Sequence, residues 1–143
     1  MIKIILIILS IFSVIYLAAG CTEEAVTQPP PEEESGTIPK PLFSDIQVKV
    51  FTPGCDKPGC HGNANNQAEL FLGEGQAFQS LVGEPSLLFP GMTRVIPDSS
   101  SKSLLIKLLK GDLPPRMPLN GPFLEDEIID SIAKWIDNGA MNN

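Results

Sequence analysis

Residues 55–61 read Cys-Asp-Lys-Pro-Gly-Cys-His, and this stretch constrains the chain more than any other feature. Two thiols lie on one bend, and His61, the sole histidine of the chain, directly follows the second thiol. The combination is typical of covalent haem attachment, in which each thiol adds to one vinyl group and the adjacent imidazole binds the iron. The usual motif has two residues between the cysteines, whereas this chain has four, so the motif is a variant. It predicts that Cys55 and Cys60 hold one haem c covalently, with His61 as proximal ligand.

The first twenty residues are predicted to be a bacterial lipoprotein signal peptide. Lys3 supplies a positive charge, an apolar run follows, and Leu-Ala-Ala-Gly precedes Cys21. Small residues before a cysteine mark the site where that cysteine is acylated and becomes the mature N-terminus. An uncleaved anchor is the alternative, although the 17 residues from Ile4 to Gly20 are only just long enough to span a membrane. In both cases we expect export, to the periplasmic side of the inner or outer membrane or to the cell surface.

Composition divides the rest of the chain into a tether and one domain. Residues 21–41 contain five prolines and five glutamates without periodicity, which is typical of an extended, acidic, Pro-rich tether. Residues 42–143 are long enough for one domain with a limited core, and a large apolar cofactor would supply much of its interior. In this domain acidic side chains outnumber basic ones, and the basic residues form no patch. We therefore expect no nucleic-acid partner.

Two segments of the domain have a clear helical period. Ser101–Lys110 is predicted as a helix because four leucines form one stripe, cap residues precede it and Gly111 follows. Glu125–Asn138 is predicted as a second helix, with isoleucines on one face beside Trp135, acidic residues at its start and Gly139 after its end. The residues of the two apolar faces are Leu104, Leu105, Leu108, Leu109, Ile128, Ile132 and Ile136.

The other segments are less clear. A short helix is expected over Glu74–Val82, and loops rich in proline and glycine fill most of the remainder. Leu42–Thr52 fits both a strand, by the alternation of Ile46, Val48 and Val50, and a helix, by the spacing of Phe43, Ile46 and Val50. The local pattern does not decide between them.

With one histidine in the chain, a sixth iron ligand has to be sought among the methionines. Met117 lies in Pro-Pro-Arg-Met-Pro, a backbone with few accessible conformations, so little ordering entropy opposes its bond to iron. Met92 is the second candidate and Met141 the third, while a lone methionine otherwise fills a core or lies at the surface. We predict that His61 and Met117 bind the iron.

Other uses of the two cysteines and the histidine fit the sequence less well. A Cys55–Cys60 disulfide is open to an exported protein but does not explain why His61 follows. Zinc requires four nitrogen or sulfur ligands with more than one close pair, and blue copper requires two histidines. Cu(I) on these donors is chemically allowed but leaves the loop spacing unexplained. Nucleophilic catalysis is disfavoured, because adjacent residues seldom present side chains to each other and no orienting partner is evident.

Taken together, these motifs resemble the small c-type cytochrome domains of planctomycetes and other environmental bacteria, a branch of the class I cytochrome c fold. The resemblance covers Leu42–Ala140, and members with a longer loop between the cysteines occur. Its motifs are Phe51–Gly62, Leu70-Phe71-Leu72, Arg94-Val95-Ile96-Pro97, Ser103-Leu104-Leu105, Arg116-Met117-Pro118, Glu127-Ile128-Ile129, Trp135-Ile136 and Gly139-Ala140.

The resemblance implies an all-α fold of three to four short helices around one covalently bound haem. It implies thioethers at Cys55 and Cys60, His61 and Met117 as axial ligands, and a first segment that is helical and packs across the C-terminal helix near Trp135. Arg94 and Arg116 are candidate partners for the haem propionates, or else solvated arginines.

We therefore expect a lipid-anchored electron-transfer protein and not an enzyme. Its expected partners are redox proteins with a basic docking face, and the membrane through the lipid on Cys21. Two alternatives stay open: a haem-based sensor or enzyme with a labile sixth ligand, and a structural lipoprotein stapled by a disulfide and without haem.

Overall fold

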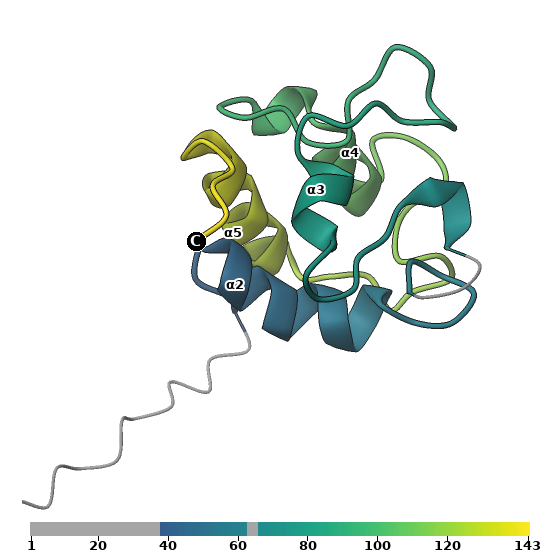
Figure 1. The fold of residues 1–143 in the computed structure, drawn as a ribbon, viewed down its shortest axis with the longest axis horizontal. Coiled ribbons are helices and arrows are strands. Elements are labelled where there is room, and N and C mark those ends of the chain that lie inside the picture. Colours follow the sequence, from purple (N-terminus) through teal and green to yellow (C-terminus); the bar gives the residue numbers. More distant parts are fainter. Residues whose placement is uncertain (1–37, 63–65) are drawn as a thin grey trace, which may run out of the picture. The chain divides into compact units, whose positions relative to one another are not determined.

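The computed structural model describes residues 38–62 and 66–143. Within these ranges the chain forms four α-helices, one π-helix and two short 3-10 helices, and its β-structure is limited to two isolated bridges (Figure 1). The predicted all-α class is therefore confirmed. No helix in this part of the chain is long and apolar enough to cross a membrane. The predicted signal peptide, Cys21 and residues 21–37 of the tether lie outside the described residues.

The ambiguous first segment is helical. The α-helix α2, Phe43–Ile46, continues directly into the π-helix η2, Gln47–Cys55. Ile46 and Val50 are buried while Val48 is 68% exposed, which is the spacing of a helix and excludes the strand alternative. Cys55 is the last residue of η2, so this continuous helical segment determines where the first thiol lies.

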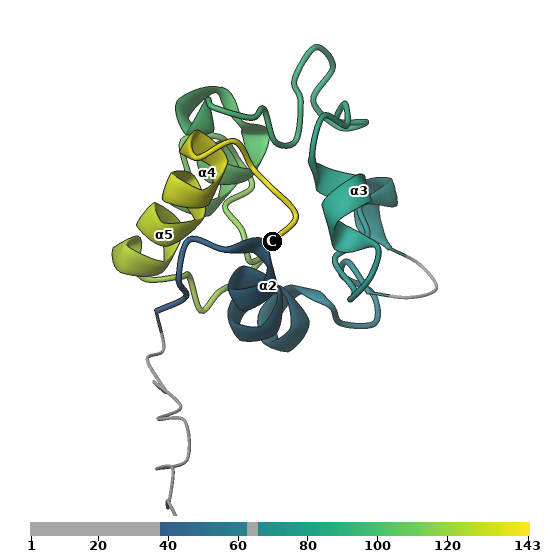
Figure 2. The ribbon, with the colours of Figure 1, turned by 60° about the vertical axis from the view of Figure 1, so that its left-hand side comes forward.

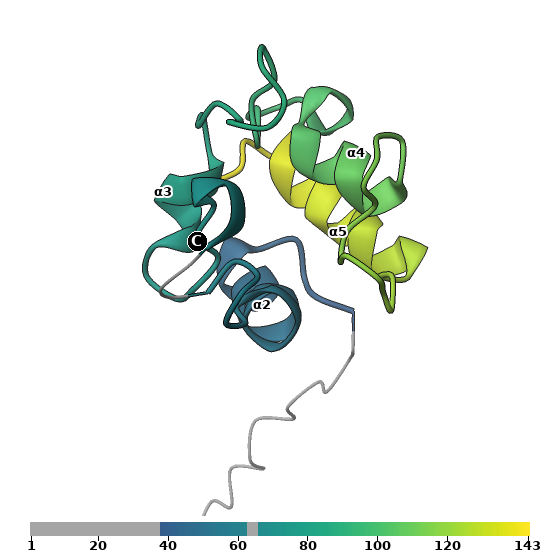
Figure 3. The ribbon, with the colours of Figure 1, turned by 90° about the vertical axis from the view of Figure 1, so that its right-hand side faces the viewer.

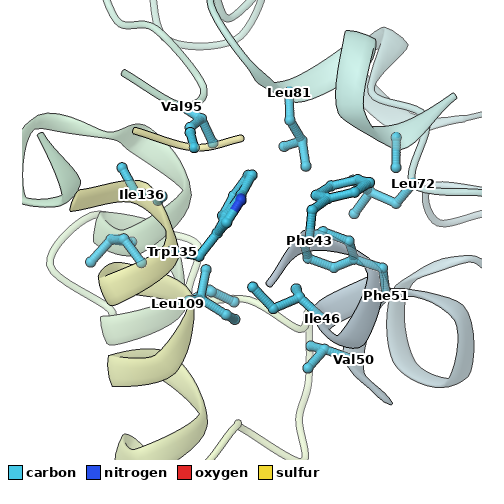
Figure 4. Close-up of a cluster of buried hydrophobic side chains, with 14 of the residues drawn as sticks. Phe43, Ile46, Val50, Phe51, Leu72, Leu81, Val95, Leu109, Trp135 and Ile136 are labelled. Carbon is cyan, nitrogen blue, oxygen red and sulfur yellow. The ribbon is translucent and has the colours of Figure 1, made fainter. Parts of the chain in front are cut away.

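The core forms where this first segment meets the C-terminal helix α5, Asp126–Asp137. The ring of Phe43 lies 5.4 Å from the Trp135 ring between centroids, so the packing implied near Trp135 is observed (Figure 4). Trp135 is 1% exposed, and its indole N–H donates to Met141 O at 2.8 Å. Burial of a side chain this large is a major stabilising contribution in a small domain.

The other two α-helices flank this core. α4, Leu104–Lys110, lies beside α5, and α3, Ala77–Leu81, lies across from the pair with α2 at one end between them (Figures 2 and 3). Both α3 and α5 fall within their predicted ranges. Gly111 ends α4 with a φ of 83°, a left-handed conformation that glycine adopts without a Cβ penalty.

The start of α4 differs from the prediction. Ser100–Lys102 forms a separate 3-10 helix, η4, and α4 begins only at Leu104. The carboxylate of Asp137 accepts both the N–H and the hydroxyl of Ser100 at 2.8 Å, which fixes η4 against α5. The Ser103 hydroxyl does not cap α4, because it accepts Ile96 N–H at 2.8 Å and donates to Ser99 O at 2.9 Å.

Contacts with the domain extend back to the end of the tether. Pro39 is buried, and its carbonyl oxygen accepts a hydrogen bond from the hydroxyl of Ser131 on α5. At the opposite end of the sequence, Asn143 caps α2, since its carbonyl and side-chain oxygens accept Ser44 N–H and Phe43 N–H at 2.9 Å. Both ends of the described chain are thus tied to the same core.

Replacing Ser103 by Ala should destabilise the domain by about 1–3 kcal/mol, because it leaves Ile96 N–H without its acceptor in a site where Ser103 is fully buried. Chemical denaturation of the mature protein measures the change. Ser101→Ala is the matched control, since Ser101 is exposed and two residues away. Equal stabilities of the two variants would show that the buried hydroxyl contributes nothing.

Candidate functional site

The bend after η2 is closed by the carbonyl oxygen of Cys55. This oxygen accepts Lys57 N–H at 2.9 Å and His61 N–H at 3.2 Å, and Cys60 N–H donates to Lys57 O at 3.0 Å. Gly59 has a φ of 81°, a left-handed conformation that glycine adopts without a Cβ penalty. The four-residue spacing therefore folds into a compact turn that holds both cysteines and the histidine close to the end of η2.

Gly62 completes this turn and was missed at the sequence level. A Cβ at this position would lie 2.8 Å from Asp56 Oδ1 and 3.0 Å from Lys57 O, so any larger residue would force the Asp56 side chain and the turn to shift. Its N–H also donates to Lys57 O at 3.2 Å. The signal was present as a glycine directly after the histidine, but only the fold shows which atoms crowd it.

His61 is oriented by a backbone carbonyl. Its Nδ1 lies 3.2 Å from Leu70 O, and this contact assigns the proton to Nδ1 because a carbonyl can only accept. Burial is the main cause that lowers the pKa of His61 and favours the neutral ring, whereas backbone hydrogen bonds to Leu70 and Gln67 raise this pKa. A neutral ring protonated at Nδ1 leaves the lone pair of Nε2 available to a metal, which is the arrangement of metal-binding histidines.

The two thiols differ in environment. Cys55 is half-buried, its Sγ lies 3.8 Å from Val50 O, and burial raises the pKa of this thiol to about 11. Cys60 is exposed. Both are free, and a free thiol is the species that adds to a vinyl group.

A cavity of about 350 Å³ lies next to the bend. Its volume is within the range of small-molecule and cofactor sites, and its wall is mainly apolar. The leucine stripe of α4 faces it, with Leu104, Leu105, Leu108 and Leu109 all in its lining. All four residues predicted to hold a haem line this cavity, namely Cys55, Cys60, His61 and Met117.

Met117 reaches the cavity from the loop between α4 and α5. Its backbone N–H donates to Leu108 O at 3.0 Å, which holds the proline-rich segment against the end of α4. Neither Met92 nor Met141 is among the lining residues, and Met141 is 57% exposed. The structure therefore brings the first of the three candidate methionines to the site and not the other two.

The two arginines have different surroundings. Arg94 is 9% exposed, lines the cavity, and donates to Ser80 O at 2.7 Å and to Ala68 O at 2.9 Å. Arg116 lies outside the lining, where it stacks 4.2 Å above the centre of the Phe123 ring and donates to Leu109 O. Of these two arginines, Arg94 is therefore the one whose positive charge lies next to the cavity.

The donor set fits haem better than a bare metal ion. Among the residues that the structure describes, no three His, Cys, Asp or Glu side chains form a metal-binding cluster, so a zinc site lacks ligands. One imidazole and one thioether suffice for haem iron, since the porphyrin supplies the other four nitrogens. The apolar wall, the free thiols and the Nδ1-protonated histidine are each what such a group requires.

Comparison with known proteins adds no further identification. No protein family model, no curated protein and no solved structure matches this chain. Function is therefore inferred from the residues of the site.

The burial of Cys55 predicts unequal thiol reactivity in the haem-free protein. With a pKa of about 11, roughly one Cys55 thiol in a thousand is ionised at pH 8, and the thiolate is the species that reacts. Iodoacetamide should therefore modify the exposed Cys60 at least about tenfold faster than Cys55. Measuring Cys55→Ser and Cys60→Ser separately by mass spectrometry isolates each thiol, and equal rates would contradict the burial of Cys55.

Proposed function

We propose that this protein is a monohaem c-type cytochrome that transfers single electrons between redox partners. The observation that carries the proposal is the convergence of Cys55, Cys60, His61 and Met117 on one apolar cavity. Met117 is more than fifty residues from the bend, so only the fold places it with the other three. Electron transfer is favoured because these residues supply both axial ligands and both attachment points.

Each residue has a distinct role in this proposal. Cys55 and Cys60 would hold the haem through thioethers, and His61 Nε2 and the Met117 sulfur would bind its iron. Haem, when bound, supplies iron that alternates between the ferric and ferrous states. The neutral thioether and the apolar wall favour the less charged ferrous state, so the reduction potential should exceed that of a bis-histidine site.

The same ligand set argues against catalysis. When the protein itself fills both axial positions, no open position is left for a substrate or a gas. A sensor or enzyme would need Met117 to leave the iron readily. The hydrogen bond from Met117 N–H to Leu108 O favours a fixed position for this residue.

Charge and exposure indicate how partners dock. The domain carries more acidic than basic residues, so we propose transient, salt-sensitive binding to a redox protein with a basic face. Leu88 and Leu119 line the cavity and are 69% and 61% exposed, so apolar contact is possible at its rim. A lipid on Cys21 would keep the exported domain at the membrane surface, and the tether would let it move between partners.

Covalent haem is the decisive test. Expressed in the periplasm with cytochrome c maturation machinery, the mature protein should gain the mass of one haem and show a pyridine haemochrome spectrum with both vinyl groups saturated. Cys55→Ala and Cys60→Ala should each leave one vinyl group unsaturated, while Ser101→Ala should behave as wild type. A colourless wild-type protein would overturn the proposal.

Met117→Ala should convert low-spin ferric iron to a high-spin or water-ligated form, because the distal thioether is lost. Optical and electron paramagnetic resonance spectra of the ferric protein measure the change, including loss of the sulfur-to-iron charge-transfer band. Met92→Ala is the matched control, since Met92 is a half-buried methionine outside the cavity lining. High-spin iron in the wild type would instead favour a sensor or enzyme with an open sixth position.

A further inference from the structure

One peptide group links His61 to a serine on α3. The carbonyl of the Leu70–Phe71 peptide is the oxygen 3.2 Å from His61 Nδ1. The N–H of the same peptide, on Phe71, donates to the Ser80 hydroxyl oxygen at 2.8 Å. A hydrogen-bond chain therefore runs from Ser80 through a single peptide unit to the imidazole ring.

We propose that Ser80 is a positioning residue for His61, a role that rests on the haem function proposed above. An amide whose N–H is hydrogen-bonded is polarised, so its carbonyl becomes a stronger acceptor. The Ser80 hydroxyl therefore strengthens the bond that fixes the His61 tautomer and ring orientation. A stronger bond at Nδ1 also makes the imidazole a more electron-donating ligand, which stabilises ferric iron.

The chain around this peptide is held from several sides. Leu72 N–H donates to His61 O at 2.7 Å, and the buried Gln47 side chain donates to Leu72 O at 2.9 Å. Gln47 belongs to η2, the helix that ends at Cys55. The same helix therefore positions the Cys55 thiol and holds the segment whose Leu70 carbonyl accepts from His61. The segment that carries Leu70 O is therefore fixed on the side of the bend.

Arg94 fixes Ser80 relative to the same segment. Its two terminal nitrogens donate to Ser80 O and to Ala68 O, so one buried guanidinium ties α3 to the residues just before Leu70. Arg94 uses the backbone carbonyl of Ser80 and leaves its hydroxyl for Phe71 N–H. Replacing Ser80 by Ala thus removes the link to the peptide and retains the contact with Arg94.

The test uses the haem-loaded mature protein and compares Ser80→Ala with Ser80→Thr, which retains the hydroxyl. Ser131→Ala is the control, because it also loses a serine hydroxyl bonded to backbone, at Pro39 O on the other side of the domain. Ser80→Ala should shift the one-electron reduction equilibrium about threefold toward the ferrous form, the effect of losing part of one hydrogen bond. It should also speed exchange of the Nδ1 proton in the ferrous NMR spectrum. In a Met117→Ala background, where the ferrous iron is five-coordinate, it should lower the iron–histidine stretching frequency.

Ser80→Thr should give the wild-type value in all three measurements, and Ser131→Ala should change none of them. Haem-loaded Ser80→Ala with wild-type potential, proton exchange and stretching frequency would overturn the role of Ser80 and leave the cytochrome function intact. A wild-type protein without haem would overturn both proposals. Hydrogen exchange of the wild type is a measurement that does not depend on the folding of any variant. Fast exchange of the Phe71 amide proton would show that Phe71 N–H is not bonded to the Ser80 hydroxyl, and would overturn the proposal.

Discussion

The carbonyl oxygen of Cys55 accepts two backbone N–H groups, and the rest of the site depends on that small turn. The turn is narrow enough that both thiols and the imidazole lie beside one cavity although four residues separate the cysteines. Its geometry requires glycine at two places for different reasons. Gly59 adopts a left-handed conformation, and a side chain at Gly62 would crowd Asp56 and Lys57. The four residues between the cysteines are thus absorbed into the turn, and both thiols lie beside the same cavity.

The helix α4 serves two purposes that its sequence does not separate. Ile106 belongs to the core cluster, the leucine stripe that predicted the helix lines the cavity, and Leu109 belongs to both sets. An amphipathic period shows that one face of a helix is apolar, but it does not show whether a neighbouring helix or a ligand covers that face. In a domain of this size the distinction matters, since a cofactor-sized apolar group adds a large fraction of the interior that the chain alone can bury. The same leucines can therefore support the fold and receive a cofactor.

Most of the helices could be predicted, and the errors have physical causes. α5 and α3 fell within their predicted ranges because their apolar periods are undisturbed. α4 begins three residues later than predicted, because Asp137, far along the chain, holds Ser100 in a 3-10 turn. The first segment could not be assigned locally, since its alternation fits two periods and the choice is made by packing against Trp135. In the site, residue types with distinctive chemistry were recognisable, whereas Leu70 contributes only a carbonyl oxygen, which every residue has. No sequence pattern identifies such a partner, nor the serine behind it.

The carbonyl of Leu70 also affects the electronic character of the His61 ring. The peptide that carries this carbonyl and the cation of Arg94 act on the ring in opposite directions. A hydrogen bond at Nδ1, strengthened through the Leu70–Phe71 peptide by Ser80, makes the imidazole more electron-donating and favours the more oxidised state of a bound metal. Burial, and to a smaller extent repulsion from the Arg94 cation, lowers the pKa of His61, and the same cation disfavours additional positive charge nearby. Arg94 also donates to Ser80 O and Ala68 O, so the same cation holds α3 against the segment that carries the acceptor of His61. For a redox centre at this position, the polarised peptide and the buried charge would shift the potential in opposite directions, and both contact the segment between Ala68 and Leu72.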